Sequence, residues 1–148
     1  MASSVSVSSL SADQIEVTTP RSSAEAFRSI PGIRSESSGG EGNANIAVRG
    51  LPVAAGGAKF LQLQEDGLPI LQFGDIAFGN ADIFLRLDST MSSIESIRGG
   101  SASTLATNAP GGIINIISKT GESDSGSIAT TIGLDYDHTR TDFEFGGE

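Results

Sequence analysis

Few residues in this sequence are suited to covalent or metal chemistry. There is no Cys, and His138 is the only histidine, so a zinc–thiolate site, a disulfide framework and a histidine-rich metal site are excluded. A serine hydrolase would have to use His138 as its base, yet no Gly-x-Ser-x-Gly elbow precedes it. We therefore expect no catalytic residue and no cofactor.

The carboxylates near the end of the chain are a second candidate for chemistry. Residues 121–148 hold seven acidic residues and one basic residue, and so carry −6 of the net charge of −9. Calcium is the ion that such acids suggest, but the spacing of an EF-hand loop is not met by Asp135, Asp137, Asp142 and Glu144. We expect a polar surface and no metal site. The same net charge argues against nucleic acid as a partner, because phosphate binding needs Lys and Arg.

Two arginines stand at the ends of predicted strands, each directly before a glycine. Arg49 precedes Gly50, and Arg98 precedes Gly99. A guanidinium at such a position can leave the sheet and bind a carboxylate through two hydrogen bonds. The alternative is an ordinary, solvated residue at a strand end. The pair Asp66-Gly67 has a simpler interpretation, because Asp-Gly between two extended runs is a tight-turn signal.

Short elements must position these residues. Capping boxes at 11–14 and 22–25 predict the starts of two short helices, which end at Pro20 and at Pro31-Gly32. Further helical turns are predicted at 89–93 and 101–107. Strands are predicted at 5–7, 33–36, 44–49, 60–65, 68–73, 94–98 and 113–118. The fold class is therefore α+β, with a small mixed β-sheet and short helices in one compact unit over residues 5–120.

The tail alternates between two kinds of residue. From Ile128 to Asp137 the even positions are mostly apolar, and the odd positions are small or acidic. A membrane β-strand needs ~9–11 residues with this period, although an ordinary half-buried strand has the same pattern. Phe143 and Phe145 are placed to begin the next strand. Because one lipid-facing strand cannot satisfy its own edges, we expect the protein to continue beyond this sequence.

No targeting segment is recognisable at the start. Residues 1–20 have neither a basic n-region nor an apolar h-region, and no apolar run approaches the ~20 residues of a membrane helix. We expect a fragment that is numbered from a mature start or carries an added Met.

Five segments, in this order and spacing, resemble the N-terminal plug domain of TonB-dependent outer-membrane receptors. They are VSVSSLSADQ (5–14), AEAFRSIPGI (24–33), AVRG (47–50), LQLQEDGLP (61–69) and the long run from Ile94 to Thr120 that contains IRGG and GGIINI. Gly100 departs from the pattern, since a Pro is usual there, which suggests a divergent subfamily. The run QIEVTT (14–19) superficially resembles a TonB box, but its distance from Pro31-Gly32 fits a first helix better.

The resemblance implies a domain division and a function without catalysis. Residues 1–4 would be a leader remnant or added residues, 5–121 the plug, and 122–148 the first strand and hairpin of a truncated β-barrel. The plug would gate an active transporter in the outer membrane of a Gram-negative bacterium. The implied partners are the barrel of the same receptor, TonB through an upstream box, and a scarce nutrient such as a siderophore, cobalamin or an oligosaccharide. The alternative is a stand-alone soluble binding module with a plug-like fold.

The resemblance also implies two sets of site residues. Arg49 and Arg98 match family arginines that face barrel glutamates, so in the soluble, isolated chain we expect both to be solvent-exposed or loosely paired with an acid such as Glu95. The loops at 37–43 and 72–82 match apical loops that meet the ligand. The ligand-facing residues would be Gly39, Gly40, Glu41, Asn43, Gln72, Phe73, Asp75, Phe78 and Asn80, although ordinary flexible loops are the alternative. The acidic tail would face a lumen or loop surface and would not pack into the plug core.

Overall fold

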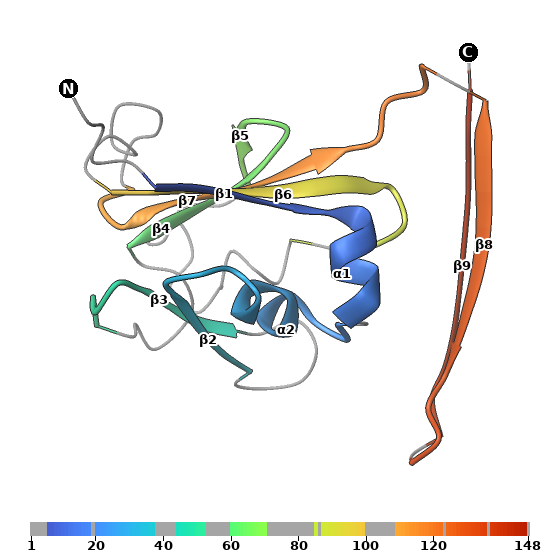
Figure 1. The fold of residues 1–148 in the computed structure, drawn as a ribbon, viewed down its shortest axis with the longest axis horizontal. Helices are drawn as coiled ribbons and strands as arrows, with labels where there is room; N and C mark the ends of the chain where they lie inside the picture. Colours follow the sequence, from blue (N-terminus) through green and yellow to red (C-terminus); the bar gives the residue numbers. More distant parts are fainter. Residues whose placement is uncertain are drawn as a thin grey trace.

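A five-stranded mixed sheet is the centre of the fold (Figure 1). The computed structural model describes residues 6–18, 20–37, 44–52, 60–70, 85, 87–99, 109–122, 124–135 and 137–147. The sheet has the order β1-β6-β7-β4-β5, with bounds Ser6–Ser11, Met91–Arg98, Gly112–Ser118, Leu61–Glu65 and Leu68–Pro69. β4 and β7 are parallel, and the other pairs are antiparallel. The predicted α+β class with a mixed sheet is confirmed.

Two short helices follow the edge strand β1, and both begin at the predicted capping boxes. For α1 (Ala12–Thr18), the backbone N–H of Ser11 donates to Gln14 Oε1 at 3.0 Å, and the Gln14 N–H donates to Ser11 Oγ at 3.4 Å. For α2 (Ser23–Arg28), the Glu25 N–H donates to Ser22 Oγ at 3.3 Å. Residues 12–18 form a helix, so the predicted first helix is confirmed.

A second, separate hairpin forms from β2 (Ile33–Ser37) and β3 (Ala44–Val48). We expected residues 44–49 to be a strand of the mixed sheet, and that assignment is wrong. The apolar side chains of this hairpin pack against α2 and the main core, so it adds a layer below the sheet instead of extending an edge. Arg28 Nε donates to the Ser35 carbonyl oxygen at 3.0 Å and ties α2 to β2.

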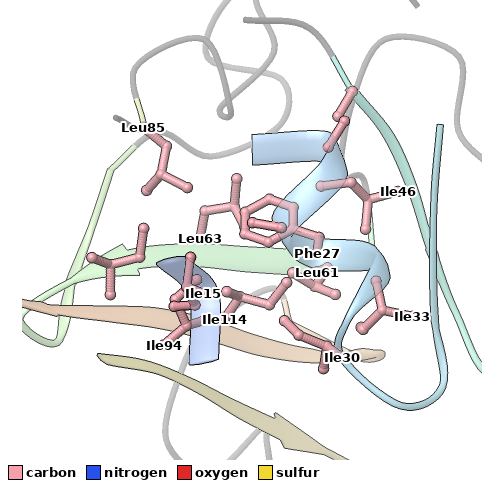
Figure 2. Close-up of a cluster of buried hydrophobic side chains, with 14 of the residues drawn as sticks. Ile15, Phe27, Ile30, Ile33, Ile46, Leu61, Leu63, Leu85, Ile94 and Ile114 are labelled. Carbon is pink, nitrogen blue, oxygen red and sulfur yellow. The ribbon is translucent and has the colours of Figure 1, made fainter. Parts of the chain in front are cut away.

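The main core lies between one face of the sheet and the layer that contains both helices and the β2–β3 hairpin (Figure 2). Phe27 is fully buried among apolar side chains of the sheet and of β3. The largest fully buried side chains are Phe27, Ile30, Leu63, Ile94, Ile113, Ile114, Val48 and Ser96. A smaller cluster of Ala109, Ile113 and Ile97 lies on the other face of the sheet.

Some predicted elements differ from those observed or lie elsewhere. Residues 91–93 belong to β6 and not to a helical turn, because Met91 pairs with Ser118 across the sheet. The run predicted at 68–73 begins as β5, whose two residues pair with β4. The turn predicted at 101–107 lies outside the described residues. Within the described part of the chain, neither helix is long and apolar enough to cross a membrane.

The tail forms a hairpin of β8 (Ser125–Ile132) and β9 (Thr139–Gly146) that stands beside α1 (Figure 1). The alternating pattern predicted a strand to residue 137, but β8 ends at Ile132. The Gly133 N–H donates to the His138 carbonyl oxygen at 2.9 Å and closes the turn, so Leu134 lies in the turn and is exposed. The described tail residues contribute nothing to the main core, as predicted.

Candidate functional site

Arg98 is the last residue of β6, and its side chain is buried, with 2% of its surface exposed. It shares the core face of β6 with Ile94 and Ser96, because side chains alternate along a strand. Glu95 points to the opposite face and is exposed, so it cannot pair with Arg98. The prediction that Arg98 is exposed or loosely paired with such an acid is therefore wrong.

Two hydroxyl groups of the edge strand hold the Arg98 guanidinium. Nη2 donates to Ser6 Oγ at 3.1 Å and also to Ser8 Oγ, and both serines belong to β1. The Nε and Nη1 atoms are buried and have no hydrogen-bond partner among the described residues. Burial, and secondly the positive charge of Arg49, lower the pKa of Arg98 from its ordinary value. The guanidinium remains protonated at neutral pH, so this is a buried and incompletely paired cation.

Arg49 lies directly after β3 in the left-handed region of the backbone, with φ 46°, and is exposed as predicted. Its backbone N–H donates to the Gly32 carbonyl oxygen at 3.1 Å. Gly32 has φ 79° and stands between the two arginines. A Cβ atom at Gly32 would lie 3.7 Å from Arg49 Cγ and 3.9 Å from Arg98 Nη1. The fold thus brings both predicted arginines together around one glycine.

An open cleft of about 540 Å³ lies at this glycine, and we call it the Gly32 cleft. It is lined by Gly32, Ile33, Arg34, Ala47, Arg49, Gly50, Leu51 and Pro52. Arg34 is balanced by Glu36, whose Oε1 accepts from Arg34 Nε at 2.9 Å. None of the ion pairs between described residues includes Arg49 or Arg98. The cleft therefore has the charge to bind a carboxylate, but a guanidinium is too basic to shuttle protons.

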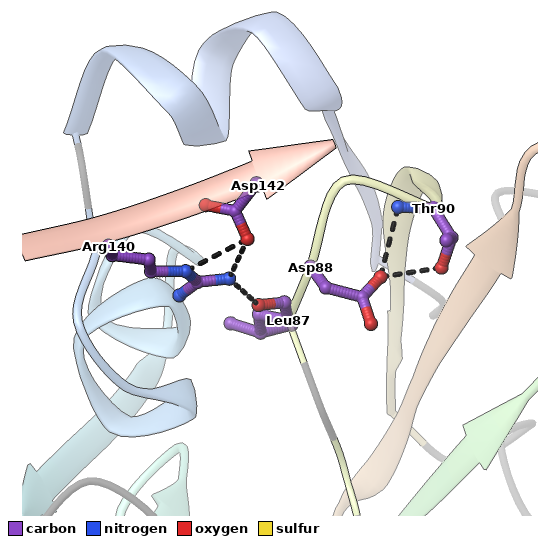
Figure 3. Close-up of polar contacts among 5 residues, drawn as sticks. All are labelled: Leu87, Asp88, Thr90, Arg140 and Asp142. Carbon is purple, nitrogen blue, oxygen red and sulfur yellow. Dashed lines mark hydrogen bonds and ion pairs between the residues drawn. The ribbon is translucent and has the colours of Figure 1, made fainter. Parts of the chain in front are cut away.

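Away from the Gly32 cleft, polar contacts join the tail hairpin to the rest of the described chain, which we call the body (Figure 3). Arg140 Nη2 donates to the Leu87 carbonyl oxygen at 3.3 Å and to Asp142 Oδ1 at 2.8 Å. Lys119, just after β7, forms an ion pair with Glu144, and this hydrogen bond lowers the pKa of Glu144. Between hairpin and body is a cavity of about 180 Å³ whose lining includes Ile15, Met91, Ala129 and Arg140.

The two faces of the tail hairpin differ in chemistry. Ile128, Ile132, Phe143 and Phe145 share the outer face and are 65–77% exposed, with Ile128 paired directly opposite Phe143. The inner face, toward the body, carries the partly buried side chains of Arg140, Asp142 and Glu144. Within the described ranges, no group of three or more acids or histidines is arranged to hold a metal ion. The sequence pattern had indicated the two faces but not the partners Lys119 and Leu87, which lie on other elements.

The predicted ligand-facing residues are not brought together by anything the structure describes. Gly39, Gly40, Glu41, Asn43, Gln72, Phe73, Asp75, Phe78 and Asn80 all lie outside the described residues. Their role stays a prediction. The serines that contact Arg98 were missed at the sequence level, although Ser6 and Ser8 repeat with the period of a strand face.

Comparison with known proteins gives a family and a fold. A family model described as "TonB-dependent Receptor Plug Domain" matches residues 1–113. No curated protein sequence matches the chain significantly. Among solved structures, the ferric yersiniabactin uptake receptor FyuA from Yersinia pestis is similar, with a TM-score of 0.77 and 26% identity over 98% of this chain and 22% of the receptor.

Two receptors from Pseudomonas aeruginosa share the fold at lower identity. The ferripyoverdine receptor of the outer membrane has a TM-score of 0.68 and 16% identity over 98% of this chain and 18% of its own. A mutant of the ferric enterobactin receptor has a TM-score of 0.64 and 22% identity over 95% of this chain and 22% of the receptor. The chain thus spans about a fifth of the length of the receptors it resembles.

Proposed function

The chain belongs to the plug domain family of TonB-dependent receptors, whose model matches residues 1–113, and on that premise we propose that it gates an outer-membrane active transporter. The family is one of receptor plugs and not of enzymes. In this proposal residues 5–121 are the plug, residues 122–148 begin the barrel wall, and TonB acts through a box upstream. The whole assembly is a cell-outer-membrane protein, with the plug inside the barrel lumen.

The observation that carries the proposal is the two-faced tail hairpin. Its outer face is apolar and exposed, and its inner face meets the plug through polar and ionic contacts. The wall of an outer-membrane barrel has this arrangement, with apolar side chains toward lipid and polar side chains toward the lumen. An apolar face with this exposure is unfavourable in water, which counts against a stand-alone soluble module.

The Gly32 cleft is the proposed plug–barrel interface. Arg49 supplies an exposed cation, and Arg98 supplies a buried one with unpaired N–H groups. A buried charge is costly unless a counter-charge with good hydrogen-bond geometry reaches it. Carboxylates of the barrel wall would provide that counter-charge. The apical residues named above would meet the nutrient on the other side, and this part of the proposal rests on their match to family loops.

A ferric siderophore is the first substrate to test. The similar receptors are named for ferric yersiniabactin, ferripyoverdine and ferric enterobactin. Cells that express the full-length protein would be compared with a deletion strain for uptake of labelled ferric siderophores, cobalamin and oligosaccharides. We expect uptake of one class, abolished by a protonophore or by loss of TonB. Absence of energy-dependent uptake, with the protein in the soluble periplasmic fraction, would contradict the transporter and favour the binding module.

The interface role of Arg49 has its own test. In the full-length receptor, Arg49→Ala should raise the permeability of the outer membrane to small solutes, because a wall carboxylate loses its partner. In the isolated chain the same change should alter stability by less than ~0.5 kcal/mol, as is usual for surface sites. Arg34→Ala is the matched control, since Arg34 lines the same cleft but pairs with Glu36. Equal leakage from both variants would contradict the assignment.

A further inference from the structure

We propose that Ser6 and Ser8 are positioning residues for Arg98, and that through them the docking of strand β1 is coupled to carboxylate binding at the Gly32 cleft. The proposal rests on the interface role of Arg98 given above. It adds an energetic coupling between edge strand β1 and the Gly32 cleft. It also assigns a role to β1, which contributes little to the main core.

The first step is the position of β1. It is an edge strand that pairs with β6 alone, from Ser6 opposite Arg98 to Ser11 opposite Ser93. Its alternate residues Ser6 and Ser8 are half-buried on the face of Arg98, whereas Val7 and Ser9 are exposed on the other face. The described partners of the Arg98 guanidinium are therefore two serine hydroxyl groups of β1, and β1 is held in the sheet by β6 alone.

The second step is the cost of covering Arg98. With β1 docked, Nη2 has its two hydroxyl acceptors, but Nε and Nη1 are buried without partners. If β1 separates from β6, the side of the guanidinium that Ser6 and Ser8 hold would open to water. Since an unpaired buried donor loses its hydration without compensation, the unpaired N–H groups oppose β1 docking in the absence of an anion.

The third step is the place where an anion would relieve that cost. Arg98 Nη1 lies beside Gly32, which lines the cleft. Because Gly32 has no side chain, nothing from this residue stands between Nη1 and the cleft. A carboxylate in the cleft would meet the unpaired side of the guanidinium, while the serines continue to hold the other side. Carboxylate binding and β1 docking then stabilise each other, and the effect is reciprocal by linkage. Withdrawal of β1 would in turn release Arg98 from its position at the interface.

A double-mutant cycle on the 148-residue chain tests the positioning role. Amide hydrogen exchange of β1 is measured for the native chain, for Ser6→Ala/Ser8→Ala, for Arg98→Met, and for the combination. We expect the serine changes to speed β1 exchange roughly tenfold in the Arg98 chain, because bonds to a charged group are lost, and to have little effect in the Arg98→Met chain. Equal effects in both backgrounds would overturn the proposal.

Two controls separate positioning from strand stability. Ser9→Ala lies on the same strand but on the exposed face, and should leave β1 exchange close to that of the native chain. Ser6→Thr/Ser8→Thr keeps both hydroxyls and should retain slow exchange. If the Thr pair exchanged as fast as the Ala pair, the hydroxyl groups would not be the cause and the positioning role would fall.

The coupling itself is tested with acetate as the probe carboxylate. Sodium acetate should slow β1 exchange in the native chain relative to sodium chloride at equal ionic strength, but not in Arg98→Met. No slowing, or equal slowing in both chains, would overturn the coupling. These results are independent of the receptor assays. If the double-mutant cycle shows coupling but the Arg98→Met receptor leaks no more than the native receptor, only the assignment of a barrel carboxylate as the partner of Arg98 is overturned. If the cycle shows no coupling but the Arg98→Met receptor leaks more, only the positioning role of the serines is overturned.

Discussion

Ser96 is a buried polar residue on the core face of β6, among mostly apolar side chains. Ser96 is 1% exposed, and its hydroxyl has no hydrogen-bond partner among the described residues. It lies between Ile94 and Arg98 on that face and pairs with Ser8 of β1. Ser96 lines neither of the two cavities described above, whereas Arg98 Nη1 lies beside Gly32 of the Gly32 cleft. Its hydroxyl is therefore a cost to the folded state with no described compensation.

Ser96→Ala should consequently stabilise the chain. Removal of an unsatisfied buried hydroxyl recovers about 1 kcal/mol in the free energy of unfolding, while the small side chain leaves little cavity. Urea unfolding is the measurement. Ser92→Ala, at an exposed position of the same strand, is the control and should change stability by less than ~0.5 kcal/mol. A clear loss of stability in Ser96→Ala would mean that the hydroxyl has a partner.

Gly112→Ala should be among the most damaging single changes. Gly112 has φ 151°, and a Cβ atom there would lie 2.5 Å from the Ile97 carbonyl oxygen and 3.4 Å from Arg98 Cα. Backbone strain and the displacement of β6 together should cost about 3 kcal/mol of unfolding free energy. Gly146→Ala provides the contrast, because its nearest neighbour, Ser125 Oγ, is 4.0 Å away. Similar stabilities for the two variants would refute this assignment of the clash.

At the scale of elements, the Asp66-Gly67 turn joins β4 and β5 and also fastens them to β7. Asp66 and Gly67 have φ of 51° and 81°, as a tight hairpin turn requires. The Asp66 carboxylate accepts from the Ser118 N–H at 2.8 Å, and the Gly67 N–H donates to Asn115 Oδ1 at 2.9 Å. These bonds reach across about fifty residues of sequence, so a local turn signal also fixes a distant strand end.

This turn gives the chain an acid-sensitive contact. The hydrogen bond from the Ser118 N–H lowers the pKa of Asp66, so the stabilisation is present above the ordinary value of about 3.9 and is lost as pH falls through the lowered pKa. Asp66→Asn keeps the turn geometry but not the charge. Urea unfolding should show the variant less stable than the native chain at neutral pH, and this difference should shrink as pH falls below the ordinary Asp value. Parallel stability curves over that range would rule out a contribution from the charge.

The elements that could be predicted from sequence are those with local causes. Capping boxes located both helices, and the Asp-Gly pair located the β4–β5 turn. The face of Arg98 could not be predicted, because Ile94 and Ile97 lie on opposite faces of β6 and either face fits the pattern. The contact between Ser8 and Arg98 was equally inaccessible, since 90 residues separate them and no local signal selects β6 as the partner of β1.

At the scale of the whole molecule, ionic and polar contacts hold the tail hairpin against the rest of the described chain. Lys119 pairs with Glu144, and Arg140 reaches the Leu87 carbonyl oxygen, but no apolar residue of the hairpin joins the described core. Contacts of this kind weaken with salt when they lie near the surface. The hairpin should therefore separate from the plug under conditions that leave the plug folded.

Release of the hairpin can be followed with a nitroxide at Thr130→Cys, since the chain has no other cysteine. The paramagnetic relaxation enhancement of the α1 amide protons by this nitroxide should fall in about 1 M salt and in Glu144→Gln, because the hairpin then moves away from α1. Because Lys119 lowers the pKa of Glu144, the contact persists above the ordinary value of about 4.3 and is lost as pH falls through the lowered one. Asp135→Asn, in the exposed turn, is the control at neutral pH. An unchanged α1 signal in Glu144→Gln and in high salt would show that other contacts hold the hairpin.

The pairing of β1 with β6 also sets an order in time. Ser6 lies opposite Arg98, a separation of 92 residues, so the strand that is synthesised early finds its partner only after most of the plug has been made. Contacts of such long range are slow to form, because the closure of a large loop precedes any gain from the contact. β1 is thus made before every other strand of the sheet, yet it stays unpaired until β6 has been synthesised, so it is among the last strands to join the sheet.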